Sequence, residues 1–255
     1  FRYYDQTFQC LNKNAHGGEN VETALRDSCN IFFYNCAKRL GITKMNEYAS
    51  AFGLGQKTGV EIAESAGTLA GPEEREAAGG VWQSGDTIQA GIGQSDNLFT
   101  PLQLSNSCAT VANGGTRYQL HLVQSLIDNS SGTVTETQPK IEESLDLHKS
   151  TLTAVKSGMR LVATQGAPSL IFNQLRTEVA AKTGTSQVFV NGVKKNNGFL
   201  ITFAPYDNPE ISVASVVELA GSGTSTAEIT SSIIKYWYQN NTDEKTNQKT
   251  GALLN

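Results

Sequence analysis

The residues best suited to chemistry form the run Lys182-Thr183-Gly184-Thr185-Ser186, which directly follows the apolar segment 177–181. A lysine in this place supplies a fixed positive charge, and the glycine lets another backbone or a ligand approach closely. The two threonines occupy alternate positions of a predicted strand, so their hydroxyls point to one side. Charge and hydroxyl groups together can hold a carboxylate. If this strand borders a cleft, the N–H of Thr185 is free to stabilise an oxyanion.

The tripeptide Lys-Thr-Gly carries little information by itself, because the chain contains two further copies. Lys57-Thr58-Gly59 follows no apolar strand, and Lys249-Thr250-Gly251 lies in the polar C-terminal segment. Both are predicted to be non-catalytic loops.

A second candidate is Ser28-Cys29-Asn30, which interrupts a helical pattern. Apolar residues recur at helical spacing on both sides of it, within residues 19–40. Residues 27–30 are short and mostly polar, as in turns and helix caps. A helix cap is the simplest interpretation of this tripeptide in isolation. A tight junction between two helices would expose Ser28 and Asn30 on a cleft.

The elements around these residues predict an α+β domain. Strand patterns cover 177–183, 187–190, 198–204 and 211–218, and a hairpin is predicted within 121–136. Helices are predicted from Pro101 to about Ala112, over 150–164 and over 224–239. The acidic run at 73–76 is predicted to be a solvated loop. Residues 1–239 are expected to form one domain, and residues 240–255 a polar C-terminal tail.

Composition narrows the possible functions. The formal net charge of -4 argues against a nucleic-acid partner, whose binding domains are usually basic. The sequence contains no apolar run long enough to cross a membrane. The four cysteines form no C-x-x-C pair, which argues against zinc, and spacing favours none of the possible disulfides, so mostly buried free thiols are expected. The three histidines lack partners at the usual ligand spacing, so neither a catalytic histidine nor a metal site is predicted.

The motifs S-x-x-K, S-D-N and K-T-G occur together in penicillin-binding proteins and class A β-lactamases. In this chain Ser28-x-Asn30 precedes Lys182-Thr183-Gly184, which is the order of those proteins. From about Cys10 to Tyr238 the sequence resembles class B penicillin-binding proteins, especially their elongation-type branch. The similar blocks read ALRDSCNIFFYNCAKRLG, FGLGQKTGVEIAE, IGQSDNLFTPLQLSNSCATVANGG, AAKTGTSQ and FLITFAPYDNPEISVASVVE.

The resemblance implies a β-lactamase/transpeptidase-like fold, with an antiparallel sheet flanked by helices, that is incomplete at its N-terminal side. It implies a serine D,D-transpeptidase that cross-links peptidoglycan stem peptides, is a target of β-lactams, and uses no metal or organic cofactor. The implied catalytic residues are Ser28, which relays a proton, Lys182 beside it, and Asn30, which binds the substrate amide. The implied substrate-binding residues are Thr183, Gly184 and Thr185, around the terminal carboxylate.

The nucleophile of the family pattern is missing, because no S-x-x-K occurs before Ser28. The sequence contains this pattern once, as Ser232-Ile233-Ile234-Lys235, after K-T-G and on a predicted helix; it is interpreted as helix surface. The nucleophile is therefore expected upstream, in a longer protein of which this chain is a piece. A natural truncation without activity is the alternative. The chain alone is expected to be inactive and unstable.

Other functions of the same fold stay open at this stage: a serine β-lactamase, a penicillin-sensing domain or a catalytically inactive scaffold. For the transpeptidase, the resemblance implies an extracytoplasmic domain at the cell membrane, anchored by an N-terminal segment that this chain lacks. The implied partners are the upstream segment with the nucleophilic serine and a cell-wall glycosyltransferase.

Overall fold

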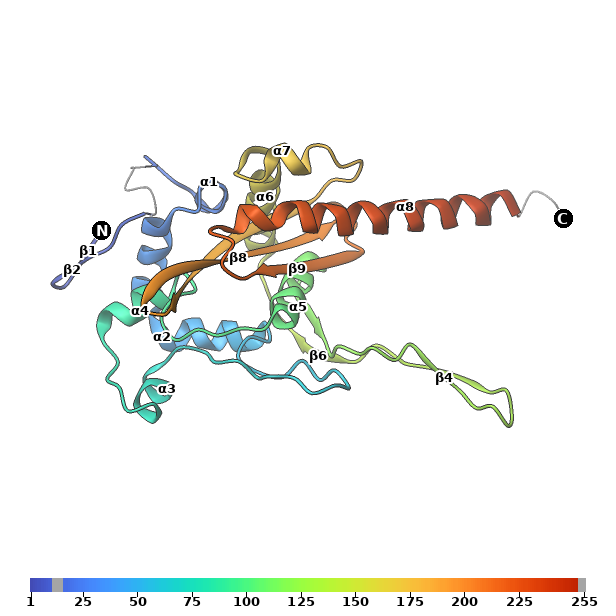
Figure 1. The fold of residues 1–255 in the computed structure, drawn as a ribbon, viewed down its shortest axis with the longest axis horizontal. Coiled ribbons are helices and arrows are strands. Elements are labelled where there is room, and N and C mark those ends of the chain that lie inside the picture. The colour runs from blue at the N-terminus through green and yellow to red at the C-terminus, as the bar shows by residue number, and fades with distance from the viewer. Residues whose placement is uncertain (11–15, 252–255) are drawn as a thin grey trace.

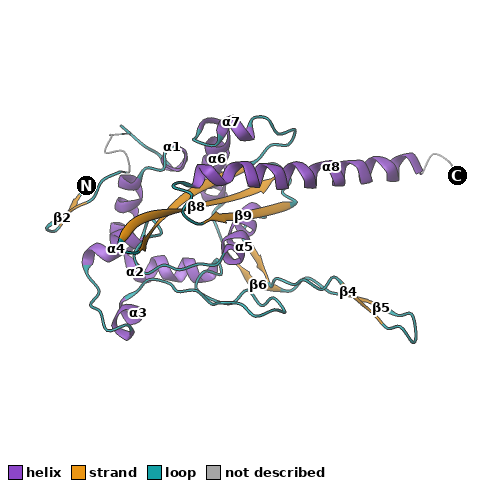
Figure 2. Cartoon of the chain, viewed as in Figure 1, coloured by secondary structure: helices purple, strands orange, loops and turns teal. Residues whose placement is uncertain are grey.

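The centre of the molecule is a three-stranded antiparallel sheet with helices on both faces (Figures 1 and 2). The structure is a computed structural model that describes the backbone of residues 1–10 and 16–251, and side chains within these ranges up to residue 241. The elements in chain order are β1 (Arg2–Tyr3), β2 (Gln6–Thr7), α1 (Val21–Arg26), α2 (Asn30–Ala51), α3 (Pro72–Ala77), α4 (Ser84–Ala90), α5 (Pro101–Ala112), β3 (Thr116–Tyr118), β4 (Ser125–Ile127), β5 (Val134–Glu136), β6 (Ile141–Ser144), α6 (Lys149–Gln165), α7 (Ser169–Phe172), β7 (Ala180–Val190), β8 (Val193–Ala204), β9 (Ile211–Val217), the 3-10 helix η1 (Gly223–Thr226) and α8 (Ala227–Gly251).

Strand β7 lies at one edge of this sheet, in the order β7-β8-β9. It pairs with β8 along its whole length, and Asn191 and Gly192, both at positive φ, close the hairpin as expected for a two-residue turn. Strand β9 pairs with β8 only between Gly198 and Ala204. Residues 186–197 therefore form a two-stranded ribbon that extends beyond the three-stranded part.

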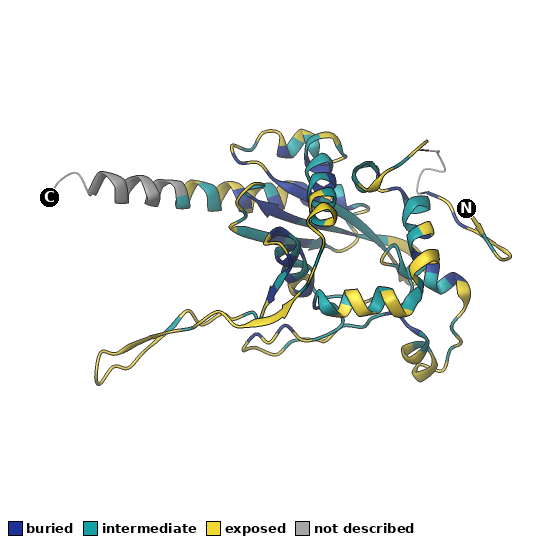
Figure 3. Cartoon of the chain, turned by 180° about the vertical axis from the view of Figure 1, so that it is seen from behind, coloured by how far each residue is buried: buried dark blue, intermediate teal, exposed yellow. Residues whose placement is uncertain are grey.

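The two faces of the sheet are buried against different helices. Cys108 and Ala112 of α5 and Met159 of α6 pack against Ala180 and Phe203 on one face. On the other face α8 packs across the sheet and then projects away from it (Figure 1). The buried residues concentrate in this layered region, as Figure 3 shows in dark blue, and the long β4–β5 hairpin is mostly exposed. Burial between the layers is the main source of stability, at roughly 25 cal/mol per Å² of apolar surface.

Most predicted elements are confirmed, with three corrections. The strands predicted at 177–183 and 187–190 are one strand, β7, because residues 184–186 keep their pairing with β8. The acidic run at 73–76 is helical, within α3. Helix α8 continues to Gly251, so most of the predicted polar tail has a helical backbone. The proposed domain boundary at residue 239 stays a prediction.

No described helix combines the length and apolar character that a membrane span requires.

Candidate active site

Ser28 lies at the junction between α1 and α2, as the sequence predicts. Two hydrogen bonds end α1 here: the N–H of Ser28 donates to the carbonyl of Leu25, and the N–H of Cys29 donates to the carbonyl of Ala24. This pairing is a Schellman motif, whose left-handed residue is usually glycine. Here that residue is Ser28, with φ of 49°. The strained turn presents an exposed serine hydroxyl immediately before the N-terminus of α2.

Close packing of α1 on α6 fixes the position of this junction. A Cβ atom added at Gly158 of α6 would lie 2.6 Å from Leu25 Cδ1 and 3.0 Å from the Cα of Glu22. Helix α6 in turn covers β7. The serine and the Lys182 strand are therefore held by one continuous packed layer.

Lys182 and Ser28 make direct contact although 154 residues separate them. The Nζ atom of Lys182 donates to Ser28 Oγ at 2.6 Å, and to the carbonyl of Thr183 at 2.8 Å. Burial lowers the pKa of Lys182 to about 8, because desolvation disfavours the ammonium form. The two residues that the resemblance implied to be neighbours therefore meet, at an edge strand of the antiparallel sheet.

Asn30 is the first residue of α2 and is half-buried. Burial raises the pKa of Tyr34 one turn further along α2, and the side chain of Asn30 partly opposes this rise. Asn30 therefore lies in the same junction as Ser28, while its role toward a substrate stays a prediction.

The backbone of η1 approaches Gly184 closely, but the missing side chain that permits this is that of Gly223, since a Cβ atom added at Gly184 itself would meet only Phe199 Cβ, at 3.3 Å. A Cβ atom added at Gly223 would lie 2.4 Å from the carbonyl oxygen of Gly184 and 2.3 Å from that of Phe199. The N–H of Gly223 also donates to Thr185 Oγ1 at 3.4 Å. Because side chains alternate along a strand, Thr183 and Thr185 lie on the face opposite to Lys182.

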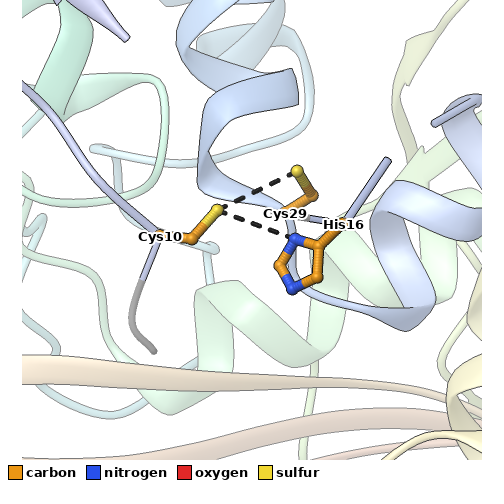
Figure 4. Close-up of side chains that lie close together, drawn as sticks. All are labelled: Cys10, His16 and Cys29. Atoms are coloured by element: carbon orange, nitrogen blue, oxygen red, sulfur yellow. Dashed lines mark hydrogen bonds between the residues drawn. The ribbon is translucent and has the colours of Figure 1, made fainter. Parts of the chain in front are cut away.

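A cluster next to Ser28 was missed by the sequence argument. The donor atoms of Cys10, His16 and Cys29 lie within 4.8 Å of one another (Figure 4). Cys10 Sγ lies 3.9 Å from Cys29 Sγ and 3.7 Å from His16 Nδ1. Thiolate and imidazole are ligands for soft cations such as Zn²⁺, so the fold places His16 beside possible co-ligands that the sequence spacing did not indicate; the absence of a metal site stays a prediction. The fold brings together residues whose sequence spacing matches no common metal motif.

The four cysteines are free, as predicted; Cys10, Cys29 and Cys108 are buried, and Cys36 is half-buried. Burial raises the pKa of Cys29, and raises that of Cys108 to about 12. Both thiols therefore stay protonated at neutral pH.

The S-x-x-K pattern at Ser232 lies on helix α8, after the K-T-G strand. Ser232 Oγ donates to the carbonyl of Glu228 within α8, at 2.9 Å. Ser232 and Lys235 line a cavity of about 630 Å³ between α8 and the segment that follows α7. Of the two other K-T-G copies, the one at Lys57 lies in a loop as predicted, whereas the one at Lys249 lies in the helical backbone at the end of α8, so the loop prediction was wrong there.

Comparison with solved structures identifies the class of fold. The chain superposes on PBP2 of Pseudomonas aeruginosa, solved in complex with WCK 5153, with a TM-score of 0.80, 28% sequence identity and coverage of 93% of this chain and 53% of that one. It also resembles a chain from a peptidoglycan synthase complex that coordinates polymerization and crosslinking. That match has a TM-score of 0.75 and 26% identity, and covers 87% of this chain and 38% of that one.

Sequence comparison agrees with the fold. Residues 1–235 match the penicillin binding protein transpeptidase domain, and the chain belongs to this family. The peptidoglycan D,D-transpeptidase MrdA of Escherichia coli K12 is 31% identical over 259 residues, covering 94% of this chain. The chain spans about 40% of the length of that relative. The predicted fold and the resemblance to elongation-type class B proteins are confirmed.

Proposed function

We propose that this chain forms part of the transpeptidase domain of a serine D,D-transpeptidase that cross-links peptidoglycan stem peptides and is acylated by β-lactams. The observation that carries the proposal is the 2.6 Å contact between Lys182 Nζ and Ser28 Oγ. It joins the S-x-N and K-T-G motifs, which lie far apart in the sequence, at the free edge of a sheet. The family and the relatives named D,D-transpeptidase support the same activity.

The geometry suggests how these residues move a proton. Because Ser28 Oγ accepts a hydrogen bond from the Lys182 ammonium, the hydroxyl proton of Ser28 is free to be donated elsewhere. In acylation, a nucleophilic serine forms an ester with the penultimate D-alanine of the stem peptide. The bond to the terminal D-alanine breaks, and its amine receives a proton through Ser28. An amine of a second stem peptide then displaces the serine and completes the cross-link.

The nucleophilic serine is proposed to lie in a preceding segment of a longer parent protein. Support comes from the absence of S-x-x-K before Ser28 and from the 40% share of the E. coli relative that this chain covers. The cell-membrane location on the extracytoplasmic face, the N-terminal anchor and a glycosyltransferase partner belong to this proposal. The similarity to a chain of a peptidoglycan synthase complex supports the last of these.

The proposal is tested on the parent protein, meaning this chain joined to its preceding segment. Intact-mass spectrometry with benzylpenicillin should detect a stoichiometric adduct, and a peptide ending in D-Ala-D-Ala should release D-alanine when an acceptor amine is present. Rapid turnover of a cephalosporin would instead indicate a β-lactamase. An adduct without transfer to the amine would indicate a sensing domain, and no adduct would indicate an inactive scaffold.

The pH dependence follows from the lowered pKa of Lys182. The ammonium form, which donates to Ser28, decreases tenfold per pH unit above a pKa of about 8. We expect the acylation rate by penicillin to fall on the alkaline side of about pH 8. In Lys182→Arg this decline should disappear, since a guanidinium stays charged. Stopped-flow kinetics measure the acylation rate from pH 6 to about 10.5, which is close to the ordinary pKa of lysine. An unchanged decline in the arginine variant would contradict the assignment.

Ser232 gives a second, smaller test. We expect Ser232→Ala in the parent protein to label with fluorescent penicillin as strongly as the unmodified protein, because this hydroxyl is bonded to the backbone of α8. The matched variant Ser28→Ala should label more slowly. Loss of label in Ser232→Ala alone would show that the assignment of the nucleophile is wrong.

A further inference from the structure

A single side chain connects the loop after α4 to the K-T-G strand. Gln94 Nε2 donates to the backbone carbonyl of Thr185 at 3.1 Å, across 91 positions of sequence, and this contact is partly buried. Thr185 follows Gly184 directly in the motif. The bond therefore acts on the backbone of the motif and leaves its side chains free.

The direction of this bond reveals which way the Thr185 peptide groups point. In an antiparallel ladder, the N–H and C=O of one residue both face the partner strand or both face away from it. Thr185 C=O accepts from a side chain of the loop, and Thr183 C=O accepts from Lys182 Nζ. These two residues have the same parity on β7, whose pairing with β8 has no register shift. Their N–H groups therefore face the free edge of the sheet, where a substrate carbonyl can reach them.

The loop that carries Gln94 is rigidly held. Ser95 adopts a positive φ of 64°, and its hydroxyl accepts from Arg75 at 3.3 Å. Arg75 also forms ion pairs with Asp86 and Asp96. Asn97 donates to the carbonyl of Gln94 at 3.2 Å. Because these hydrogen bonds and ion pairs hold the loop, the Gln94 amide has a fixed position relative to β7.

The same loop is anchored to the helix that begins beside Ser28. Gly91, at the end of α4, packs so tightly on α2 that an added Cβ atom would lie 2.4 Å from the Cβ of Ala37. Direct contacts therefore run from α2 through α4 to Gln94 and Thr185, and they connect the two elements that carry the motifs. At Gly91 these contacts leave no room for a larger residue.

We propose that Gln94 is a positioning residue for the oxyanion donor: it holds the Thr185 peptide so that the Thr185 N–H points to the reacting carbonyl. The inference rests on the proposed transpeptidase function. Removing one donor from an oxyanion hole lowers the rate about 10²–10³-fold. A donor that is present but misaligned should lower the rate by less. We therefore expect Gln94→Ala to lower the acylation rate constant about tenfold, with little change in the dissociation constant for penicillin.

The test uses the parent protein and benzylpenicillin labelled with ¹³C at the β-lactam carbonyl. Stopped-flow kinetics separate binding from acylation, and difference infrared spectroscopy measures the ester carbonyl of the acyl-enzyme. Hydrogen bonds to that carbonyl lower its stretching frequency, so Gln94→Ala should raise or broaden the band. Gln94→Glu, of similar size but without the donor, should do the same. The control is Gln89→Ala on α4, a half-buried glutamine that should change neither reading.

The outcomes separate the two proposals. If the unmodified parent protein is not acylated, the proposed function fails and the positioning role fails with it. If it is acylated, and both Gln94 variants keep its acylation rate constant and its carbonyl band, the positioning role is overturned while the function stands. Slower acylation with an unchanged band in both variants would also overturn the positioning role. That result would indicate a general structural defect, because the hydrogen bonds to the carbonyl would be unaltered.

Discussion

Replacing Lys182 by alanine in the parent protein is expected to lower the acylation rate by penicillin about 10³-fold. The substitution removes the ammonium that donates to Ser28 at 2.6 Å. It thereby removes both the proton path and the positive charge that would hold a carboxylate; general acid–base catalysis alone contributes roughly 10²–10⁴-fold. Stopped-flow fluorescence with a reporter penicillin measures the rate. The effect should fall on the acylation step rather than on the melting temperature.

The chain contains its own control for this experiment. Lys57 belongs to an identical Lys-Thr-Gly tripeptide but is exposed, in a loop. We expect Lys57→Ala to acylate at the rate of the unmodified protein. An equal decrease of the acylation rate in the two variants, or no decrease in Lys182→Ala, would contradict the assignment of Lys182 to the site.

The second large effect concerns the location of the penicillin adduct. We expect no adduct on the 255-residue chain alone, and one adduct per molecule on the parent protein, because the proposed nucleophile lies in the preceding segment. Intact-mass spectrometry detects the adduct, and peptide mapping locates it. Supplying the preceding segment as a separate chain should restore labelling, with the label on that segment.

Folding must be checked in the same samples, because an unfolded chain would also remain unlabelled. We expect the isolated chain to melt without cooperativity and the reconstituted pair to melt cooperatively. A domain is stable by only about 5–15 kcal/mol, so loss of one central packed element can remove the whole margin. A stoichiometric adduct on any residue from 1 to 255 would contradict the proposal. A pair that melts cooperatively and stays unlabelled would favour an inactive scaffold.

The contact between Ser28 and Lys182, which defines the site, could be predicted from the sequence. The resemblance to penicillin-binding proteins, carried by the order of the two motifs, implied that Ser28 and Lys182 lie beside each other. Helix α5 could be predicted because Thr100 is an N-cap and Pro101 occupies the first helical position. These signals are local, and the structure agrees with them.

Features that depend on distant contacts could not be predicted. The apolar alternation of β7 stops at Gly184 and the polar residues after it, although the strand continues, because pairing with β8 replaces the missing local signal. The bond from Gln94 to Thr185 and the cysteine–histidine cluster join segments through the tertiary fold. The acidic run at 73–76 predicted a solvated loop, whereas it is helical and Arg75 within it forms ion pairs with Asp86 and Asp96.

The end of the three-stranded part of the sheet coincides with the end of the K-T-G motif. Thr185 pairs with Gly198, and Gly198 is the last β8 residue that β9 reaches, through Val217. Opening residues 186–195 therefore breaks a single ladder, because in the described part of the chain only Asn196 and Asn197 of the ribbon also bond to Leu219 and Gly221; opening residues 180–184 disrupts the core of the domain. Local unfolding follows such cooperative units. Under the proposed transpeptidase function, the ribbon is therefore the part of the sheet that can bend toward a substrate strand while residues 180–184 keep their places.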